Sequence, residues 1–260
     1  MIQSINRLLG FLDLRVTRKS TYDKLVSASD AAIDIELMKA IDPVLRHQYL
    51  DALDHSRAQL RQDLFVLSQL GFKKRGFFVE FGATDGVMLS NTHLLENEFF
   101  WDGILAEPAR RWHSALKKNR NCVLETSRCV WSKSGEILNF NEADEGEFSS
   151  IESFSDSDHN SSKRKSVSKY ELETISLRDL LEQNNAPKSI DFLSIDTEGS
   201  EFEILNAFDF GAYRFNVITC EHNYTSNREK IHDLLVGHGY RRSLESLSRW
   251  DDWYVHRDVM

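Results

Sequence analysis

The sequence predicts an α/β fold with a doubly wound, mostly parallel sheet of seven strands, preceded by a helical N-terminal appendage. Two observations favour the sheet. The runs Phe77–Phe81 and Ile190–Ile195 are short and nearly all apolar, as expected for parallel strands buried on both faces. Between and after them, stretches of strand length alternate with segments whose apolar residues recur at helical spacing. This alternation is typical of βαβ units, so the strands are expected to run parallel.

The first strand leads into a turn on which the functional prediction depends. Gly82 and Gly86 flank this turn, and glycine allows torsions and close approaches that a Cβ would forbid. Ser90 or Asn91 is expected to cap the helix that follows. The next strand ends in Glu107, about 20 residues after Gly86. An acid at that place in a Rossmann-type site holds ribose hydroxyls.

The glycine spacing indicates which nucleotide would bind. Gly82 and Gly86 form Gly-x-x-x-Gly, which lacks the Gly-x-Gly-x-x-Gly loop that places backbone amides on a pyrophosphate. A cofactor with a ribose, no phosphate and a charged amino-acid end fits, and S-adenosylmethionine has these features. The alternative is a βαβ unit without a ligand. The predicted cofactor residues are Glu80, Phe81, Gly82, Ala83, Thr84, Asp85, Gly86, Asn91, Glu107 and Pro108.

The same residues resemble a known family, the FkbM-type S-adenosylmethionine-dependent methyltransferases. The resemblance rests on residues 78–86 (FVEFGATDG), 89–92 (LSNT), 106–108 (AEP) and 190–202 (IDFLSIDTEGSEF), and it extends from Phe72 to the C-terminus. Thr84 stands where that family often has Asn, which keeps a polar turn residue. The resemblance implies a class I, Rossmann-like methyltransferase sheet and O-methylation, often of sugars or polyketide-like scaffolds. It also implies that the turn after the third strand meets the adenine, with Ser127, Arg128 and Cys129 as candidates.

Composition limits the class of protein. The chain has 260 residues and a net charge of −9, with 32 basic and 41 acidic residues. It is long enough for one α/β domain with an appendage. An acidic chain is a poor nucleic-acid binder, since that affinity depends on neutralising phosphates. No run approaches the roughly 20 apolar residues of a membrane-spanning helix. Three scattered cysteines without metal-ligand spacing indicate reduced thiols and a cytoplasmic location.

The N-terminal part predicts helices. Asp42–Leu70 is the longest helical segment, with Asp42 as N-cap, Pro43 in the first position and Gly71 after the end. Its stripe of leucines is expected to pack on the sheet domain, and homodimerisation through the stripe is the alternative. We therefore predict a helical appendage over residues 1–71 and a methyltransferase domain over 72–260.

The remaining elements follow in regular order. Residues 126–131 and 137–140 are expected to form a hairpin or a strand extension. The polar segment 141–169 is either a flexible linker or a lid that orders over the substrate. Strands at 215–220, 240–246 and 253–256, with a helix at 227–238, then close the sheet with one reversed edge strand.

Candidate catalytic residues lie where two strands end, because ligands of open α/β sheets bind beyond the carboxyl ends of the strands. Asp196 is expected to bind the ammonium group of the cofactor or to position the substrate. His222 is the candidate general base, because imidazole titrates near neutral pH; otherwise it only bonds to the neighbouring loop. Alternatively, Asp196, Glu198, Glu221 and His222 hold a divalent cation that acidifies a hydroxyl.

The residues after the fourth strand indicate which class of acceptor atom takes the methyl group. Methyltransferases that act on amides and base nitrogens commonly carry Asn/Asp-Pro-Pro-Tyr there, whereas this chain has Asp196-Thr197-Glu198-Gly199. An acidic, hydroxylic turn suits a hydroxyl acceptor better than a flipped base. We therefore expect an O-methyltransferase that acts on a small-molecule or glycan acceptor and methylates a sugar hydroxyl. The alternatives are a nucleic-acid methyltransferase, an NAD-linked sugar oxidoreductase and a non-catalytic protein that keeps the fold.

Overall fold

A computed structural model describes residues 18–143, 149–151 and 166–259, which form two compact units, 1–40 and 41–260. The described part of the first unit is one long helix, α2 (Lys19–Ala40). Among the described residues, no helix is both long and apolar enough to cross a membrane. The predicted lid or linker at 141–169 lies partly outside the described residues.

The prediction of one helix over Asp42–Leu70 is wrong. Asp42 does cap a helical turn, but that turn is η2 (Pro43–Leu45), followed by α3 (Arg46–Leu53) and, after a break, α4 (Gln62–Gln69). The break is stabilised by a buried hydrogen bond of 2.7 Å from Ser56 Oγ to Asp63 Oδ1. The leucine stripe correctly indicated burial for Leu60, Leu64 and Leu67, but Leu50 is exposed, and the spacing could not reveal this tertiary contact. Residues 41–71 belong to the unit that carries the sheet.

The predicted seven-stranded sheet is confirmed. The strand order is β10-β11-β9-β8-β1-β2-β3, and β9, β8, β1, β2 and β3 run parallel. The bounds are β1 (Phe77–Phe81), β2 (Asp102–Ala106), β3 (Val123–Glu125), β8 (Ser189–Ile195), β9 (Arg214–Glu221), β10 (Tyr240–Ser243) and β11 (Asp251–His256). The reversed strand was expected at the edge of the sheet, and this detail is wrong. The reversed strand is β11, which inserts between β9 and β10 and pairs antiparallel with both.

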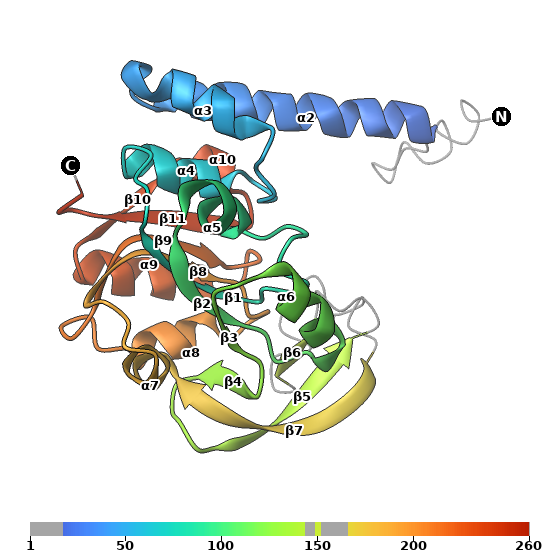
Figure 1. The fold of residues 1–260 in the computed structure, drawn as a ribbon, viewed down its shortest axis with the longest axis vertical. Helices are drawn as coiled ribbons and strands as arrows, with labels where there is room; N and C mark the ends of the chain where they lie inside the picture. Colours follow the sequence, from blue (N-terminus) through green and yellow to red (C-terminus); the bar gives the residue numbers. More distant parts are fainter. Residues whose placement is uncertain (1–17, 144–148, 152–165, 260) are drawn as a thin grey trace. The chain divides into compact units, whose positions relative to one another are not determined.

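Helices cover both faces of this sheet (Figure 1). The larger apolar core packs α7 (Leu177–Gln183), α8 (Glu201–Asn206) and α9 (Asn227–Gly237) against one face. On the other face lie α4, α5 (His93–Phe99) and α6 (His113–Asn119), the last preceded by η3 (Arg110–Trp112). A short helix, α10 (Glu245–Ser248), joins the two strands of the closing hairpin.

A second, four-stranded sheet was not expected. Its order is β4-β7-β5-β6, with bounds β4 (Arg128–Trp131), β5 (Ile137–Ala143), β6 (Ser150–Ile151) and β7 (Ser166–Ser176). The predicted hairpin of residues 126–131 and 137–140 is therefore wrong, since β7 lies between its two strands. The described residues of the predicted lid belong to β5, β6 and β7, and Ile151 of β6 packs in a small core with Cys129 and Phe140.

The carboxyl ends of β1 and β8 approach each other closely, and Gly82 makes this approach feasible. Gly82 has φ +76°, and a Cβ on it would lie 2.2 Å from the backbone oxygen of Asp196. The close approach expected at Gly82 is made by the protein itself, because the Asp196 backbone lies against the turn after β1. Gly82 is therefore needed for packing, and its contact with a ligand stays a prediction.

We expect Gly82→Ala to lower the stability of the protein more than Gly135→Ala. Both glycines have left-handed torsions, yet nothing lies within 4 Å of a Cβ built on Gly135. The torsion alone should cost about 1–2 kcal/mol in each variant, and the collision in Gly82→Ala should add roughly 1–3 kcal/mol. Urea unfolding of both variants measures the difference. Equal losses would show that the Asp196 backbone yields freely.

Candidate functional site

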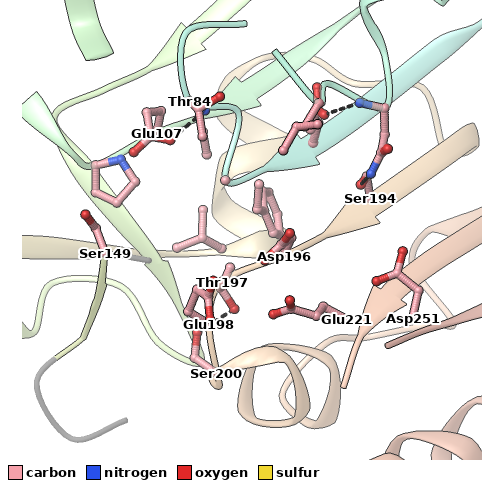
Figure 2. Close-up of a pocket in the computed structure, with 18 of the residues that line it drawn as sticks. Thr84, Glu107, Ser149, Ser194, Asp196, Thr197, Glu198, Ser200, Glu221 and Asp251 are labelled. Atoms are coloured by element: carbon pink, nitrogen blue, oxygen red, sulfur yellow. Dashed lines mark hydrogen bonds between the residues drawn. The ribbon is translucent and has the colours of Figure 1, made fainter. Parts of the chain in front are cut away.

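A pocket of about 420 Å³ opens where the carboxyl ends of β1, β2, β8 and β9 meet, a volume typical of small-molecule sites. Figure 2 shows Thr84, Glu107 and Ser149 on one side, Asp196, Thr197 and Glu198 in the middle, and Glu221 and Asp251 on the other side. Of the residues predicted from sequence, those that line the pocket are Glu80, Phe81, Gly82, Thr84, Asn91, Glu107, Pro108, Cys129, Asp196, Glu198 and Glu221.

Glu107 dominates the first side of the pocket. It follows β2 and is buried, and its carboxylate accepts hydrogen bonds from the backbone N–H groups of Thr84 at 2.7 Å and Ala109 at 2.8 Å (Figure 2). Burial raises the pKa of Glu107 to about 7, although both N–H groups favour the ionised form. Each oxygen keeps a lone pair for a hydroxyl of a bound molecule.

An apolar wall adjoins Glu107. Cys129 and Val130 of β4, Phe140 of β5 and Ile151 of β6 line the pocket together with Pro108. Burial raises the pKa of Cys129 to about 12, so its thiol behaves as a small apolar group. A flat, uncharged ring could bind against such a wall at a small cost in lost hydration.

The middle of the pocket is a strained turn between β8 and α8. The buried carboxylate of Glu201 fixes it by accepting hydrogen bonds from the N–H groups of Thr197 at 2.9 Å and Gly199 at 3.0 Å. Glu198 has φ +59°, a left-handed torsion that a side chain disfavours. Four further pocket residues share this strain, and such residues cluster at functional sites; they are Thr84, Leu89, Asn223 and Tyr224.

Three carboxylates converge beside this turn. Asp196, Glu198 and Glu221 each offer an oxygen, and these oxygens lie within 4.8 Å of one another. Glu198 and Glu221 are buried, whereas Asp196 is exposed to the pocket. Desolvation and the neighbouring Glu198 raise the pKa of Asp196, and desolvation with Asp196 raises the pKa of Glu221. A group of this kind can share a proton or accept one.

Asp251 extends the acidic group from the reversed strand. It lies opposite Glu221 in the β9–β11 pairing, and Gln62 Nε2 of α4 donates to its Oδ2 at 2.7 Å. Burial raises the pKa of Asp251 to about 7, against the effect of the Gln62 bond. Sequence reasoning missed both residues, because neither stands in a motif and only the placement of β11 and α4 brings them together.

Glu80 acts on the loop after β1 as well as on the pocket. Its carboxylate accepts hydrogen bonds from the N–H of Asn91 at 2.7 Å and from the Thr92 hydroxyl, and Arg120 Nη1 lies 3.8 Å away. Arg120, which was not predicted, also donates to the Gly86 carbonyl at 3.0 Å. The N-cap of α5 is Thr92, and not Ser90 or Asn91 as expected, although Ser90 Oγ accepts a hydrogen bond from the N–H of His93 at 3.1 Å.

Three predicted residues of the loop shape it without lining the pocket. Asp85 accepts from the N–H groups of Val87 and Met88, so its carboxylate closes the turn. A Cβ on Gly86 would lie 2.6 Å from Cγ of Arg120, so this glycine is needed for packing. Ala83 is buried and likewise lies outside the pocket lining.

His222 does not reach the pocket, which corrects its proposed role as general base or metal ligand. Its ring is buried, Nδ1 accepts from the N–H of Tyr224 at 3.0 Å, and Nε2 lies 3.8 Å from Asp252 Oδ1. Desolvation lowers the pKa of His222, while Asp252 opposes this shift. Successive side chains along a strand point to opposite faces. Because Glu221, the last residue of β9, lines the pocket, the side chain of His222 points away from it.

Ser127 and Arg128 are also absent from the described pocket lining. Both bind Glu125 at the end of β3: Ser127 Oγ donates to Oε1 at 2.7 Å, and the Arg128 guanidinium donates to Oε2. Arg128 further donates to Gln183 Oε1 at 3.0 Å. Of the three residues expected near an adenine, only Cys129 faces the pocket.

The comparison with protein families agrees with this geometry. Residues 80–252, more than half of the chain, match the sequence model of the methyltransferase FkbM domain. The chain belongs to this family. The sheet therefore has the fold of S-adenosylmethionine-dependent methyltransferases, and the family implies this cofactor. A search of curated proteins gives no match.

Solved structures of methyltransferases resemble the chain at low identity. An FkbM methyltransferase from Methylobacillus flagellatus has 11% identity and a TM-score of 0.44, covering 82% of this chain and 60% of that one. A precorrin-6y C5,15-methyltransferase from Geobacter metallireducens has 14% identity and a TM-score of 0.39, with coverage of 74% and 85%. A SAM-dependent methyltransferase from Aquifex aeolicus has 12% identity and a TM-score of 0.37, covering 85% of this chain and 97% of that one. The family assignment therefore rests on the sequence match.

Part of the pocket comes from outside the matched FkbM segment. Gln59 and Gln62, which precede residue 80, line it, and Gln62 is buried. No sequence motif indicates this role, since every recognised motif lies beyond Phe72. The break between α3 and α4, invisible in the leucine spacing, turns these two amides toward the site.

If Glu107 holds the cofactor ribose, Glu107→Ala should weaken binding of S-adenosylhomocysteine by roughly 1–3 kcal/mol, the scale of lost hydrogen bonds to a charged group. Asp102→Ala, at the exposed start of the same strand, is the matched control and should bind normally. Calorimetric titration measures both affinities. Unchanged affinity in a folded Glu107→Ala protein would remove Glu107 from the cofactor site.

The raised pKa of Asp251 predicts a pH-dependent stability. A carboxyl that folding keeps neutral stabilises the protein at low pH. This contribution is lost as the pH rises from 3.8, the ordinary pKa of the group, to about 7, its pKa in the folded protein. Each pKa unit is worth about 1.4 kcal/mol. Asp251→Asn, which can still accept from Gln62, should therefore gain stability relative to wild type between pH 4 and 7.

Urea unfolding at several pH values measures this difference. The exposed Asp102→Asn should show a constant difference from wild type over the same range. A constant difference for Asp251→Asn as well would mean that Asp251 titrates alike in the folded and unfolded chains.

Proposed function

We propose that the protein transfers a methyl group from S-adenosylmethionine to a hydroxyl of a sugar or glycan. The proposal rests mainly on one observation. A single pocket joins Glu107 and its apolar wall to the carboxylates of Asp196, Glu198 and Glu221. The first side suits a ribose and an adenine, and the second suits a hydroxyl nucleophile that must lose a proton.

The ribose, the adenine and the ammonium group of the cofactor would each have a partner in the first side and the middle of the pocket. Glu107 would accept hydrogen bonds from the ribose hydroxyls, and Cys129, Val130, Phe140 and Ile151 would cover the adenine. Asp196 and Glu80 offer carboxylates to the ammonium group. When bound, S-adenosylmethionine supplies an electrophilic methyl on a sulfonium and leaves as S-adenosylhomocysteine. A pocket rich in carboxylates favours that cation.

The proton of the acceptor hydroxyl would pass to a carboxylate. The hydroxyl oxygen forms the new bond to the methyl carbon, the carbon–sulfur bond breaks with its electrons going to sulfur, and the proton is left on the enzyme. Among the described residues, Asp196, Glu198 and Glu221 converge beside the middle of the pocket. The pKa values of Asp196 and Glu221 are raised toward neutral pH, which suits an acid that accepts a proton. They replace His222 in the predicted mechanism.

A second version of this step uses a divalent cation. The three oxygens within 4.8 Å are hard ligands of the kind that Mg²⁺ and Ca²⁺ prefer. Asp196, Glu198 and Glu221 would hold the ion, and its chemistry would be to lower the pKa of a bound hydroxyl. His222 is not part of this group, so the ligand set is smaller than predicted from sequence.

The test is methyl transfer from labelled S-adenosylmethionine to glycan fractions of the source cell. We expect label in a methyl ether, identified by mass spectrometry, and a loss of 10²–10⁴-fold with Glu198→Gln or Glu221→Gln. His222→Ala, if folded, should keep most of the turnover. A chelator should leave turnover unchanged if a carboxylate takes the proton, and should abolish it if a cation is needed. Label on nitrogen, or no binding of S-adenosylmethionine, would contradict the proposal.

A further inference from the structure

Four separate segments of the chain bring pocket residues side by side; we call this part of the pocket the acceptor end. An isolated bridge joins Ala58 to Leu89, Gln62 binds Asp251, and the N–H of Asn223 donates to the Trp250 carbonyl at 3.2 Å. These contacts place the segments side by side. The pocket residues of the acceptor end are Gln59, Gln62, Met88, Leu89, Asn223, Tyr224, Trp250 and Asp251.

The acceptor end combines exposed apolar groups with hydrogen-bonding groups. Tyr224 is 61% exposed and therefore lies at the rim of the pocket, where its ring packs beside His222 with ring centroids 5.3 Å apart. Met88 and Leu89 are also exposed, whereas Gln62 and Asp251 are buried. Aromatic and aliphatic surface beside amide and carboxylate groups suits a ring with apolar C–H faces and hydroxyl edges.

Among the described residues, the ionisable side chains that line the pocket are mainly acidic, and none is basic. Six carboxylates line it, those of Glu80, Glu107, Asp196, Glu198, Glu221 and Asp251, and no Lys, Arg or His is among its described lining residues. Three nearby cations are already paired: the buried Arg120 with Glu80 and Glu96, and the partly buried Arg228 and Arg242 with Asp252.

An anionic acceptor would meet this field without a counter-charge. A phosphate, sulfate or carboxylate within a Debye length of about 8 Å would be repelled by those of the carboxylates that are ionised, and it would raise the pKa values of the others further. It would also lose hydration without gaining the Arg or Lys partner that such groups need when buried. Neutral hydroxyls, in contrast, can donate to the carboxylates, and an ammonium group would be attracted.

We propose that the acceptor is a polyhydroxylated ring without an acidic group on or next to it, bound between the Tyr224 rim and the Gln62–Asp251 pair. This inference rests on the proposed function and names its substrate class. A sugar linked to a nucleoside diphosphate carries two negative charges beside its ring. Methylation therefore follows a glycosyl transfer that has released the nucleoside diphosphate.

The test uses glycan arrays in matched sets, each with a neutral glycan, an amino-bearing analogue and a sulfated or uronic-acid analogue of one backbone. The full chain is saturated with S-adenosylhomocysteine in 0.15 M salt. We expect neutral or amino-bearing members to be retained at least tenfold more than their acidic partners, and soluble UDP-glucose not to compete. Equal retention of acidic members, competition by UDP-glucose, or no retention of any glycan would overturn the inference.

Variants separate charge from shape. Glu198→Gln and Asp251→Asn should reduce the discrimination against acidic glycans, whereas Glu229→Gln, the same charge change at an exposed position of α9, should not. Tyr224→Ala should lose retention of all glycans with unchanged affinity for S-adenosylhomocysteine, and Tyr224→Phe should restore it. Equal discrimination in all three charge variants would contradict the electrostatic argument.

Calorimetry with S-adenosylhomocysteine distinguishes this inference from the proposed function. A protein that binds S-adenosylhomocysteine and retains acidic glycans refutes only the inference on charge. A protein that does not bind S-adenosylhomocysteine refutes the proposed function itself.

Discussion

The buried guanidinium of Arg120 is the interaction on which the site depends most. It pairs with Glu80 and Glu96 and donates to the Gly86 carbonyl and the Ser90 and Thr92 hydroxyls. One cation thereby compensates two carboxylates that would be costly to bury alone. It also fixes both ends of the loop after β1, since Gly86 and Ser90–Thr92 bind the same group. The position of Thr84, and through it the hydrogen bond to Glu107, follows from this arrangement.

The second constraint is the concentration of acids in one pocket. Desolvation and mutual repulsion raise the pKa values of Asp196, Glu221 and Asp251, so their ionised forms destabilise the protein without a ligand. Neighbouring groups hold these acids in place, as Gln62 does for Asp251 and Glu201 does for the turn that carries Glu198. A bound cation would lower these pKa values and recover part of that cost, which links the stability of the pocket to the charge of its ligands.

The boundary of the family match does not coincide with the boundary of the site. The FkbM match begins at residue 80, yet Gln59 and Gln62 line the pocket, and residues from Ile41 onward belong to the unit with the sheet. The reversed strand β11 contributes in a similar way, because its insertion beside β9 brings Asp251 next to Glu221. Acceptor binding is therefore expected to vary with segments outside the motifs that identify the family.

The sequence by itself determined the α/β class, the seven strands, the turn of Gly82 and the acid at Glu107, because buried parallel strands and glycine turns leave local patterns. It also indicated Asp196, Glu198 and Glu221 as strand-end acids. Only the tertiary structure decided that His222 faces inward and that Ser127 and Arg128 bind Glu125. The same holds for Gln62 and Asp251, which lie 189 positions apart. A side chain's direction at a strand end, and contacts between distant segments, depend on packing that local spacing does not encode.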